Sequence, residues 1–300
     1  MKISLVTPAG PGTRNGNRHT ALRWAAFLRA AGHRVAVSTQ DMHSAAGLML
    51  ALHARRSHDS IRTYSGKLVV ALTGTDIYRD LRTSAKAKES LELAHRLIVL
   101  QPKALEAIPR EFRKKARVVV QSSPTRLRHG PVKGKFRVCV IGHLREEKDP
   151  LRTLAALKLL KDEDLQVVHL GALLDPRLKP DTEDPRYCWL GNVPHGRALR
   201  WLASSHAMVI SSRMEGGANV VCEAIRIGVP VLASRIDGNV GLLGAKYPGY
   251  FALADERALA RLIGKARDGN FYRKLKRDIA RLRPMVDPRS EARALLAAMP

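Results

Sequence analysis

The chain has few cysteines and no long apolar run. Its 300 residues include three cysteines, Cys139, Cys188 and Cys222, which lie far apart and form no CxxC pair. Isolated cysteines in odd number argue against a disulfide framework and favour a reduced, cytoplasmic setting. No apolar stretch approaches the roughly 20 residues of a membrane-spanning helix, and the apolar segment after Met1 and Lys2 is too short for a signal peptide. We therefore expect no stable membrane anchoring.

Acidic and aromatic residues are also scarce. The chain has 27 acidic residues against 52 basic ones, a net charge of +25, and only 5% of its residues are aromatic. Such an excess of positive charge predicts an anionic partner, and nucleic acid is the general first candidate. The sequence has no RNA-binding or helix-turn-helix signature, however, and its basic residues are scattered singly, as on a solvated surface. We expect no nucleic-acid partner and keep a nucleic-acid binder as the remote alternative.

Motifs of metal and nucleophilic catalysis are missing. The 11 histidines form no HxH or HExxH cluster, and the sequence has no GxSxG elbow and no Walker loop. Residues 162–164, Asp-Glu-Asp, are similar to a DxD metal motif, but they precede an expected strand and are read most simply as a solvated turn. The sequence thus predicts an activity that requires no metal and no cofactor.

Short apolar segments alternate with helical patterns along the whole chain. Residues 19–31 illustrate a helix, because Ala21, Trp24, Ala25 and Leu28 share one face. This alternation is typical of an α/β fold with doubly wound parallel sheets. The expected strands are 3–7, 34–38, 47–52, 68–72, 97–100 and 117–120 in the first half, and 136–141, 165–170, 207–210 and 229–233 in the second.

The length of the chain favours two domains. Residues 126–135 contain proline and glycine without apolar periodicity, so we expect a linker there. It would separate an N-terminal Rossmann-like domain, 1–125, from a C-terminal one, 136–287. A last helix, 288–300, would cross back to the first domain. The expected fold has two Rossmann-like domains whose parallel sheets face each other across a cleft.

The loop after the first strand is a glycine-rich turn that opens a helix. Its spacing, G-x-G-x3-G over residues 10–16, is one residue off the dinucleotide fingerprint, and Asp41 is the nearest acidic residue to the second strand. Binding of NAD is therefore weakly supported. Arg14, Arg18 and His19 point instead to a small anion, the alternative being a tight turn with exposed arginines.

Polar residues also follow the third and fourth expected strands, where ligands gather in open parallel sheets. Asp76 is placed to cap the next helix. For His53, a structural role is at least as well supported as a catalytic one. We expect one anionic acceptor to be bound by residues from these three loops, namely Gly12, Thr13, Arg14, Asn15, Arg18, His19, His53, Arg55, Arg56, Thr73, Thr75 and Asp76.

In the second half, residues 211–234 suggest a phosphate-binding helix start. The strand near 208–210 must end at Gly216 and Gly217, which leaves free N–H groups where the next helix begins, near Ala218 or Asn219. Glu223 would lie one turn inside that helix, within reach of ribose hydroxyl groups. This pattern indicates a nucleotide-sugar site. The alternative is an ordinary loop, helix and strand whose glutamates complement the helix dipole.

A second loop, residues 141–150, also follows a strand and precedes a helix. Arg145 and Lys148 are three positions apart in it, which can bring both cations to a diphosphate leaving group and stabilise the charge that develops there. The alternative is a pair of surface cations neutralised by Glu146 and Glu147.

Together these residues resemble the GT-B glycosyltransferases of family 4. Gly142, Arg145 and Lys148 match the family's G-x-L-x-x-x-K segment, and Glu215 and Glu223 match its E-x7-E motif. The resemblance implies a ribose contact for Glu223, a donor-sugar contact for Glu215, and catalysis by Arg145, Lys148 and Glu215. The implied donor site comprises Gly142, Arg145, Lys148, Glu215, Gly216, Gly217, Ala218, Asn219, Val220 and Glu223. Residues 72–76 depart from the family, which usually has histidine before this glycine.

Four segments are more similar to the selenosugar synthases of selenoneine biosynthesis: TPAGPGTRNGNRHTALRWA, LHARRS, LTGTDIYRDL and SRMEGGANVVCEAI. This resemblance implies transfer of a sugar from UDP-N-acetylglucosamine or UDP-glucose to selenophosphate, forming a carbon–selenium bond. Selenophosphate is a small, multiply charged anion, and its deprotonated selenium needs no strong general base. The alternative is a lipid-linked or small-molecule hydroxyl acceptor. The preferred sugar and the oligomeric state remain open.

Overall fold

The computed structural model describes residues 1–13, 15–41 and 45–300 and divides them into two compact units. Unit 1 consists of Met1–Gln121, Glu215–Asn219 and Pro288–Pro300. Unit 2 consists of Ser122–Met214 and Val220–Asp287. The expected linker, 126–135, therefore belongs to unit 2, and the short segment Glu215–Asn219 belongs to unit 1.

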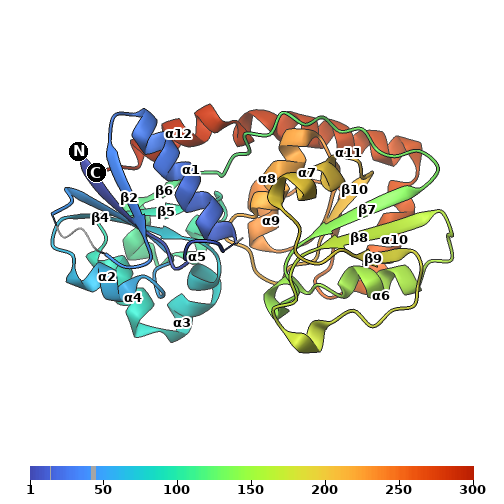
Figure 1. The fold of residues 1–300 in the computed structure, drawn as a ribbon, viewed down its shortest axis with the longest axis horizontal. Helices are drawn as coiled ribbons and strands as arrows, with labels where there is room; N and C mark the ends of the chain where they lie inside the picture. The colour runs from blue at the N-terminus through green and yellow to red at the C-terminus, as the bar shows by residue number, and fades with distance from the viewer. Residues whose placement is uncertain (14, 42–44) are drawn as a thin grey trace. The chain divides into compact units, whose positions relative to one another are not determined.

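Unit 1 contains a six-stranded parallel sheet in the order β2-β1-β3-β4-β5-β6 (Figure 1). Its central strands are apolar and buried along nearly their whole length, as expected when helices cover both faces of a parallel sheet. The strands are β1 (Lys2–Val6), β2 (Arg34–Ser38), β3 (Leu48–Leu52), β4 (Lys67–Leu72), β5 (Arg96–Val99) and β6 (Ala116–Val118).

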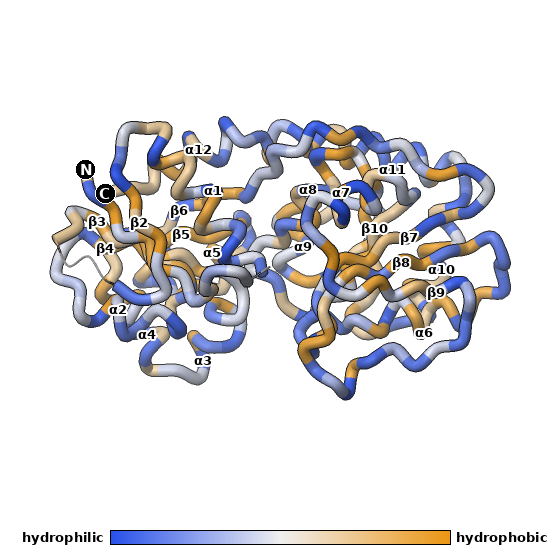
Figure 2. Tube along the Cα trace, viewed as in Figure 1, coloured by the Kyte–Doolittle hydropathy of each residue, from blue (hydrophilic) through white to orange (hydrophobic). Residues whose placement is uncertain are grey.

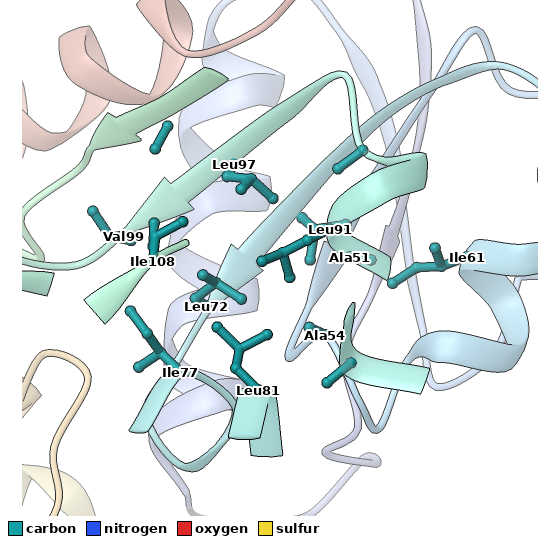
Figure 3. Close-up of a cluster of buried hydrophobic side chains, with 14 of the residues drawn as sticks. Ala51, Ala54, Ile61, Leu72, Ile77, Leu81, Leu91, Leu97, Val99 and Ile108 are labelled. Carbon is teal, nitrogen blue, oxygen red and sulfur yellow. The ribbon is translucent and has the colours of Figure 1, made fainter. Parts of the chain in front are cut away.

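Two hydrophobic clusters form the core of unit 1, one on each face of the sheet. On one face Trp24 and Leu28 of α1 and Leu295 of α12 pack on the strands. On the other face Ile61, Leu81 and Leu91, from three helices, pack on them (Figure 3). The helices are α1 (Gly16–Ala30), α2 (His58–Thr63), a π-helical turn (Asp76–Asp80), α3 (Leu81–Thr83), α4 (Ala85–Leu93), α5 (Ala104–Ala107), a 3₁₀ turn (Arg110–Lys115) and α12 (Pro288–Ala297).

Unit 2 contains a second six-stranded parallel sheet, in the order β12-β11-β10-β7-β8-β9. Its strands are β7 (Phe136–Ile141), β8 (Leu165–Leu170), β9 (Tyr187–Trp189), β10 (Ala207–Ile210), β11 (Val231–Ser234) and β12 (Tyr250–Phe251). Its helices are α6 (Arg152–Lys158), α7 (His195–Ala203), α8 (Asn219–Ile227), α9 (Asp237–Leu243), α10 (Glu256–Ala266) and α11 (Gly269–Leu282), with 3₁₀ turns at Glu146–Lys148, Pro176–Leu178 and Arg283–Val286.

The predicted α/β fold class is confirmed, because each unit contains a parallel sheet of six strands connected by helices. All ten expected strands are present, and Figure 2 shows most of them as orange, hydrophobic stretches. The structure adds β9 and β12, which the sequence did not predict. These strands have three and two residues and lie at the two edges of the second sheet.

The segment expected to be a linker is held to unit 2 by its backbone. The N–H groups of His129, Gly130 and Val132 donate to the carbonyl groups of Ile227, Ala203 and Ser204, respectively. These carbonyls lie at the ends of α7 and α8, where helices leave acceptors unsatisfied. The segment is therefore an integral part of unit 2, although it has no apolar periodicity.

Candidate functional site

The topology of each sheet brings particular loops together. Strand order reverses between β1 and β3 in unit 1 and between β7 and β10 in unit 2. In open parallel sheets, ligands bind at the carboxyl ends of the strands beside such a switch point. The loops at these two places are the glycine-rich turn and the His53 loop in unit 1, and the Gly142–Lys148 and Ser211–Met214 segments in unit 2.

His53 follows β3 in a left-handed backbone conformation, with φ of 73°. Such a conformation is uncommon for residues with a side chain, and it is found more often at functional sites than elsewhere. The ring is buried, and its Nδ1 accepts a hydrogen bond from the Arg56 N–H at 3.3 Å. Burial lowers the pKa of His53, chiefly by desolvation. The neutral ring therefore carries its proton on Nε2, which donates to Thr75 Oγ1 at 3.0 Å.

Asp76 organises the loop from within. Its carboxylate is fully buried and accepts N–H groups from both sides of the site. The donors are the main-chain groups of Ala54, Thr73, Gly74 and Ile77, at 2.7 to 3.1 Å. Asp76 thus ties the loop after β3 to the loop after β4, a positioning role that needs no direct acceptor contact.

The arginines of the His53 loop differ in their surroundings. Arg55 is half exposed and donates to the buried Asp80 carboxylate at 3.3 Å. Arg56 is exposed, and its side chain has no hydrogen bond or ion pair with the described part of the chain. Arg56 is therefore the cation of this loop whose charge is most available to an anion.

The glycine-rich turn begins α1 in an ordinary way. Asn15 caps the helix by accepting the Arg18 N–H at 3.0 Å, and Gly12 has φ of 82°, which favours glycine. Arg18 and His19 are half-buried on the first turn. Arg14, the third basic residue of this predicted anion site, lies outside the described residues.

Asp41 is the acidic residue nearest to the end of β2. Its carboxylate accepts a hydrogen bond from the hydroxyl of Ser4, in the middle of β1, at 2.8 Å. Asp41 therefore joins the segment after β2 to β1.

The glycines of segment Glu215–Asn219 are placed against unit 1. A Cβ atom on Gly216 would collide with the main chain of Thr73 and Gly74, and one on Gly217 would collide with Leu100. The Asn219 side-chain oxygen accepts a bond from Arg23 Nη2 at 3.1 Å. The small residues of this motif thus allow close backbone packing, a requirement that the sequence pattern did not reveal.

In unit 2, a buried histidine on β8 is hydrogen-bonded to the loop after β7. His169 Nε2 donates to the Gly142 carbonyl at 3.1 Å, and the Tyr187 hydroxyl donates to Nδ1 at 2.6 Å. Desolvation lowers the pKa of His169 to about 4, so the ring is neutral at pH 7. Gly171 lies so close that a Cβ atom on it would collide with the Gly142 carbonyl.

Arg145 and Lys148 lie on one tight turn of that loop. The Lys148 N–H donates to the Arg145 carbonyl at 3.0 Å, and the Ser211 hydroxyl, at the end of β10, donates to the Lys148 carbonyl at 3.1 Å. Both residues are half-buried. Arg145 Nε is buried without a hydrogen-bond partner in the part of the chain described. A buried N–H without an acceptor is costly, so Arg145 Nε is a donor that a ligand oxygen or a water molecule can satisfy.

Glu223 lies on α8, one turn after its first residue Asn219, as the sequence predicted. Its carboxylate is 2.7 Å from His195 Nε2, and the Glu223 side chain is 11% exposed. His195 begins α7, and its side chain is 46% exposed. The histidine therefore orients the carboxylate that was expected to bind ribose.

Two of these supporting histidines were missed by sequence reasoning. His195 lies 28 positions before Glu223, and His169 lies 27 positions after Gly142. No local spacing connects them to the motifs, because the fold of unit 2 brings β8 and the first residue of α7 beside them. For His169 the available signal was a histidine near the end of an apolar strand, which is not specific.

Metal-binding geometry is not found among residues 1–13, 15–41 and 45–300: no three histidine, cysteine or carboxylate side chains are grouped as a metal site would require. In the Asp162-Glu163-Asp164 turn, the two aspartates pair with Arg267, at 2.5 Å for Asp162 and 2.7 Å for Asp164. No helix in the same described ranges is long and apolar enough to cross a membrane.

Solved structures share this fold across nearly the whole chain. Anabaena Alr3699/HepE in complex with UDP and glucose has a TM-score of 0.74 at 14% identity, covering 99% of this chain and 98% of that one. Sucrose-phosphate synthase from Thermosynechococcus elongatus has a TM-score of 0.77 at 16% identity, covering 99% of both chains. A glycosyltransferase from Rickettsia africae has a TM-score of 0.70 at 12% identity, covering 99% and 97%. Because the sequence identities are so low, these similarities establish the fold alone.

The family to which the chain belongs is identified from its amino-acid sequence. No curated protein matches the chain at a significant level. The family described as Glycosyl transferases group 1 matches residues 124–281, just over half of the chain. The matched region includes the loop of Gly142, Arg145 and Lys148 and both glutamates of the E-x7-E motif. The chain belongs to the group 1 glycosyltransferases and is a glycosyltransferase of the GT-B fold.

Proposed function

We propose that this glycosyltransferase transfers a sugar from UDP-N-acetylglucosamine or UDP-glucose to selenophosphate, giving UDP, phosphate and a 1-selenosugar. The topology of the second sheet is the observation that supports the proposed binding of the donor. The Gly142–Lys148 and Ser211–Asn219 segments follow β7 and β10, the two strands on either side of the switch point of the second sheet. That is where an α/β sheet of this kind binds a nucleotide.

The donor would be bound through its diphosphate and its ribose. Arg145, with its unpartnered Nε, and Lys148 supply positive charge to the diphosphate, and Glu223, oriented by His195, accepts the ribose hydroxyl protons. Main-chain N–H groups from Gly216 to Val220 complete the phosphate contacts, and Glu215 meets the sugar. Anabaena Alr3699/HepE, solved with UDP-glucose, supports this choice of nucleotide at the level of the fold.

The acceptor would be bound beside the His53 loop of unit 1. Selenophosphate carries several negative charges, which suits Arg56 and the partly exposed Arg55. His53 is a neutral hydrogen-bond donor to Thr75, because burial lowers its pKa. The Thr75 hydroxyl, since it accepts from His53, is free to donate its own proton to a phosphate oxygen. This part of the proposal also rests on the resemblance of four segments to selenosugar synthases.

The chemistry balances without a strong base. A lone pair on selenium attacks the anomeric carbon as the carbon–oxygen bond to UDP breaks, and UDP leaves with that electron pair. Water then cleaves the selenium–phosphorus bond of the adduct, giving phosphate and the selenosugar. Arg145 and Lys148 would neutralise the departing diphosphate, the task that a metal ion performs in other transferases. We therefore propose that catalysis needs neither a metal nor a cofactor.

The acceptor half is tested by comparing two arginines. Arg56→Ala should lower kcat/KM for selenophosphate by roughly tenfold or more, because it removes a charge that contacts the anion. Its affinity for UDP should not change. Arg110→Ala is the matched control, because Arg110 is exposed and precedes β6, at the opposite edge of the sheet. Normal turnover of selenophosphate by the Arg56 variant would show that the acceptor site is misplaced.

The hydroxyl-acceptor alternative is decided in the same assay. If UDP is released with lipid-linked or small-molecule alcohols and not with selenophosphate, the enzyme is a glycosyltransferase with a conventional acceptor. Sedimentation with anionic liposomes then separates a lipid-linked acceptor from one that is free in solution.

A further inference from the structure

Unit 2 contains a cavity of about 280 Å³ that is lined mainly by arginine side chains. The segment after Pro124 contributes one wall, and α8 and the 3₁₀ turn Arg283–Val286 contribute the others. The lining residues are Thr125, Arg126, Leu127, Arg128, Arg226 and Arg283. Four guanidinium groups around one cavity are unusual, because like charges repel each other when no anion lies among them.

The charge of this arginine cavity is neutralised in part. Arg226 Nη1 pairs with Asp287 Oδ2 at 3.1 Å. Arg126 and Arg128 are exposed and have no hydrogen bond or ion pair with the residues that the structure describes. Arg283 Nη2 donates to the Ile227 carbonyl at 3.0 Å, whereas its Nε is buried and lacks a partner in the described chain. The cavity thus offers at least one buried and several exposed N–H donors to an acceptor.

The cavity is held in shape by the backbone on both sides of the arginine segment. The Ser123 N–H donates to the Val286 carbonyl at 3.3 Å, and the His129 N–H donates to the Ile227 carbonyl at 3.2 Å. Gly228 follows α8 with φ of 97°, and a Cβ atom there would lie 2.9 Å from Arg283 Nη2. The positive φ favours glycine at this position, and the absence of a Cβ leaves room for the Arg283 guanidinium beside the helix end. Such anchoring fixes the backbone that carries the arginines before a ligand arrives.

We propose that the arginine cavity is a binding site for a phosphate-type anion, separate from the donor site. Guanidinium groups bind phosphate oxygens through paired N–H groups, and several of them around one cavity select a multiply charged anion. The donor motif lies at the first residue of α8, whereas Arg226 and Gly228 lie at its end. Nine helical residues separate these ends by about 12 Å. One nucleotide diphosphate group cannot occupy both places.

The ligand can be a free phosphate compound or the phosphate headgroup of a lipid, and one experiment separates them. Binding of pyrophosphate to the full chain is measured by calorimetry with UDP present at saturation, so that the donor site is filled. Sedimentation with vesicles of phosphatidylcholine, with and without phosphatidic acid, is the second arm. The test variant is Arg126→Gln with Arg128→Gln. The matched control is Arg273→Gln with Arg281→Gln, an equal loss of charge on the exposed face of α11.

A site for free phosphate compounds predicts saturable binding of pyrophosphate. This binding should become at least about tenfold weaker in the test variant and stay unchanged in the control. Binding confined to phosphatidic acid vesicles, with the same pattern among variants, supports the lipid source. The proposal is overturned if neither arm shows saturable binding. It is also overturned if both variants lose the same affinity, because the binding would then depend only on the overall positive charge. The melting temperature of each variant is compared with that of the wild type, so that a loss of binding is not caused by unfolding. Arg226 is not substituted, because it pairs with Asp287.

Discussion

At the scale of single residues, the proposed donor site depends on charges that are oriented by less obvious partners. Glu223 and Arg145 were predicted from motif spacing, and both have surroundings that suit a ligand. His195 and His169, which orient Glu223 and the Gly142 carbonyl, were not predicted. Spacing along the chain identifies residues on one loop or one helix. It contains no information on a side chain that tertiary structure brings in from another element.

Glu223→Ala should weaken UDP binding by about tenfold or more, because a carboxylate that accepts hydroxyl protons contributes of the order of 1.5–3 kcal/mol. Calorimetric titration with UDP measures this change. Glu163→Ala is the control, since Glu163 is exposed on the turn before β8 and should bind UDP normally. Equal affinity of the Glu223 variant and the control would remove Glu223 from the ribose contact.

His169 should make stability depend on pH. In the unfolded chain its pKa is near 6.5, and in the folded chain desolvation lowers it to about 4. The unfolded state therefore binds more protons between these values, so stability is lost as pH falls from 6.5 to 4. The contribution is of the order of 3 kcal/mol. Urea unfolding of the wild type and of His169→Asn at pH 7.5 and 4.5 should show a smaller loss in the variant. Parallel losses would contradict the assignment.

At the scale of elements, the sequence was sufficient to predict ten strands and the final helix. It was insufficient for β9 and β12, which have three and two residues, and for the segment 126–135, which is held by backbone hydrogen bonds to helix ends. Backbone contacts leave no hydrophobic signal in a sequence. The same reason explains why the close packing of Gly216 and Gly217 could not be foreseen.

The loop after β7 allows a prediction based on two glycines. Gly171→Ala should destabilise the protein by about 1–3 kcal/mol and weaken UDP binding, because its Cβ would displace the Gly142 carbonyl. Gly264→Ala has open space at an interior position of α10 and should stabilise by about 0.5–1 kcal/mol. Thermal unfolding with and without UDP measures both effects. A Gly171 variant as stable as the wild type would show that the loop adapts easily.

At the scale of the whole molecule, the net charge of +25 was the main reason to consider nucleic acid. The family match assigns the chain to the glycosyltransferases instead, and the two anion sites that we propose would account for part of the charge. We expect RNA or DNA binding to be weak and to disappear in a few hundred millimolar salt, while UDP still raises the melting temperature. Tight RNA binding without any effect of UDP would favour the nucleic-acid binder.

The most direct measurement is the product of the complete reaction, identified by mass spectrometry. The protein is incubated with UDP-N-acetylglucosamine or UDP-glucose and selenophosphate, and UDP and selenium-containing sugars are quantified together. The proposed function predicts UDP and a 1-selenosugar in equal amounts, dependent on Glu223 and Arg56. Absence of UDP release with selenophosphate, or release of UDP without selenium in the sugar product, would contradict it.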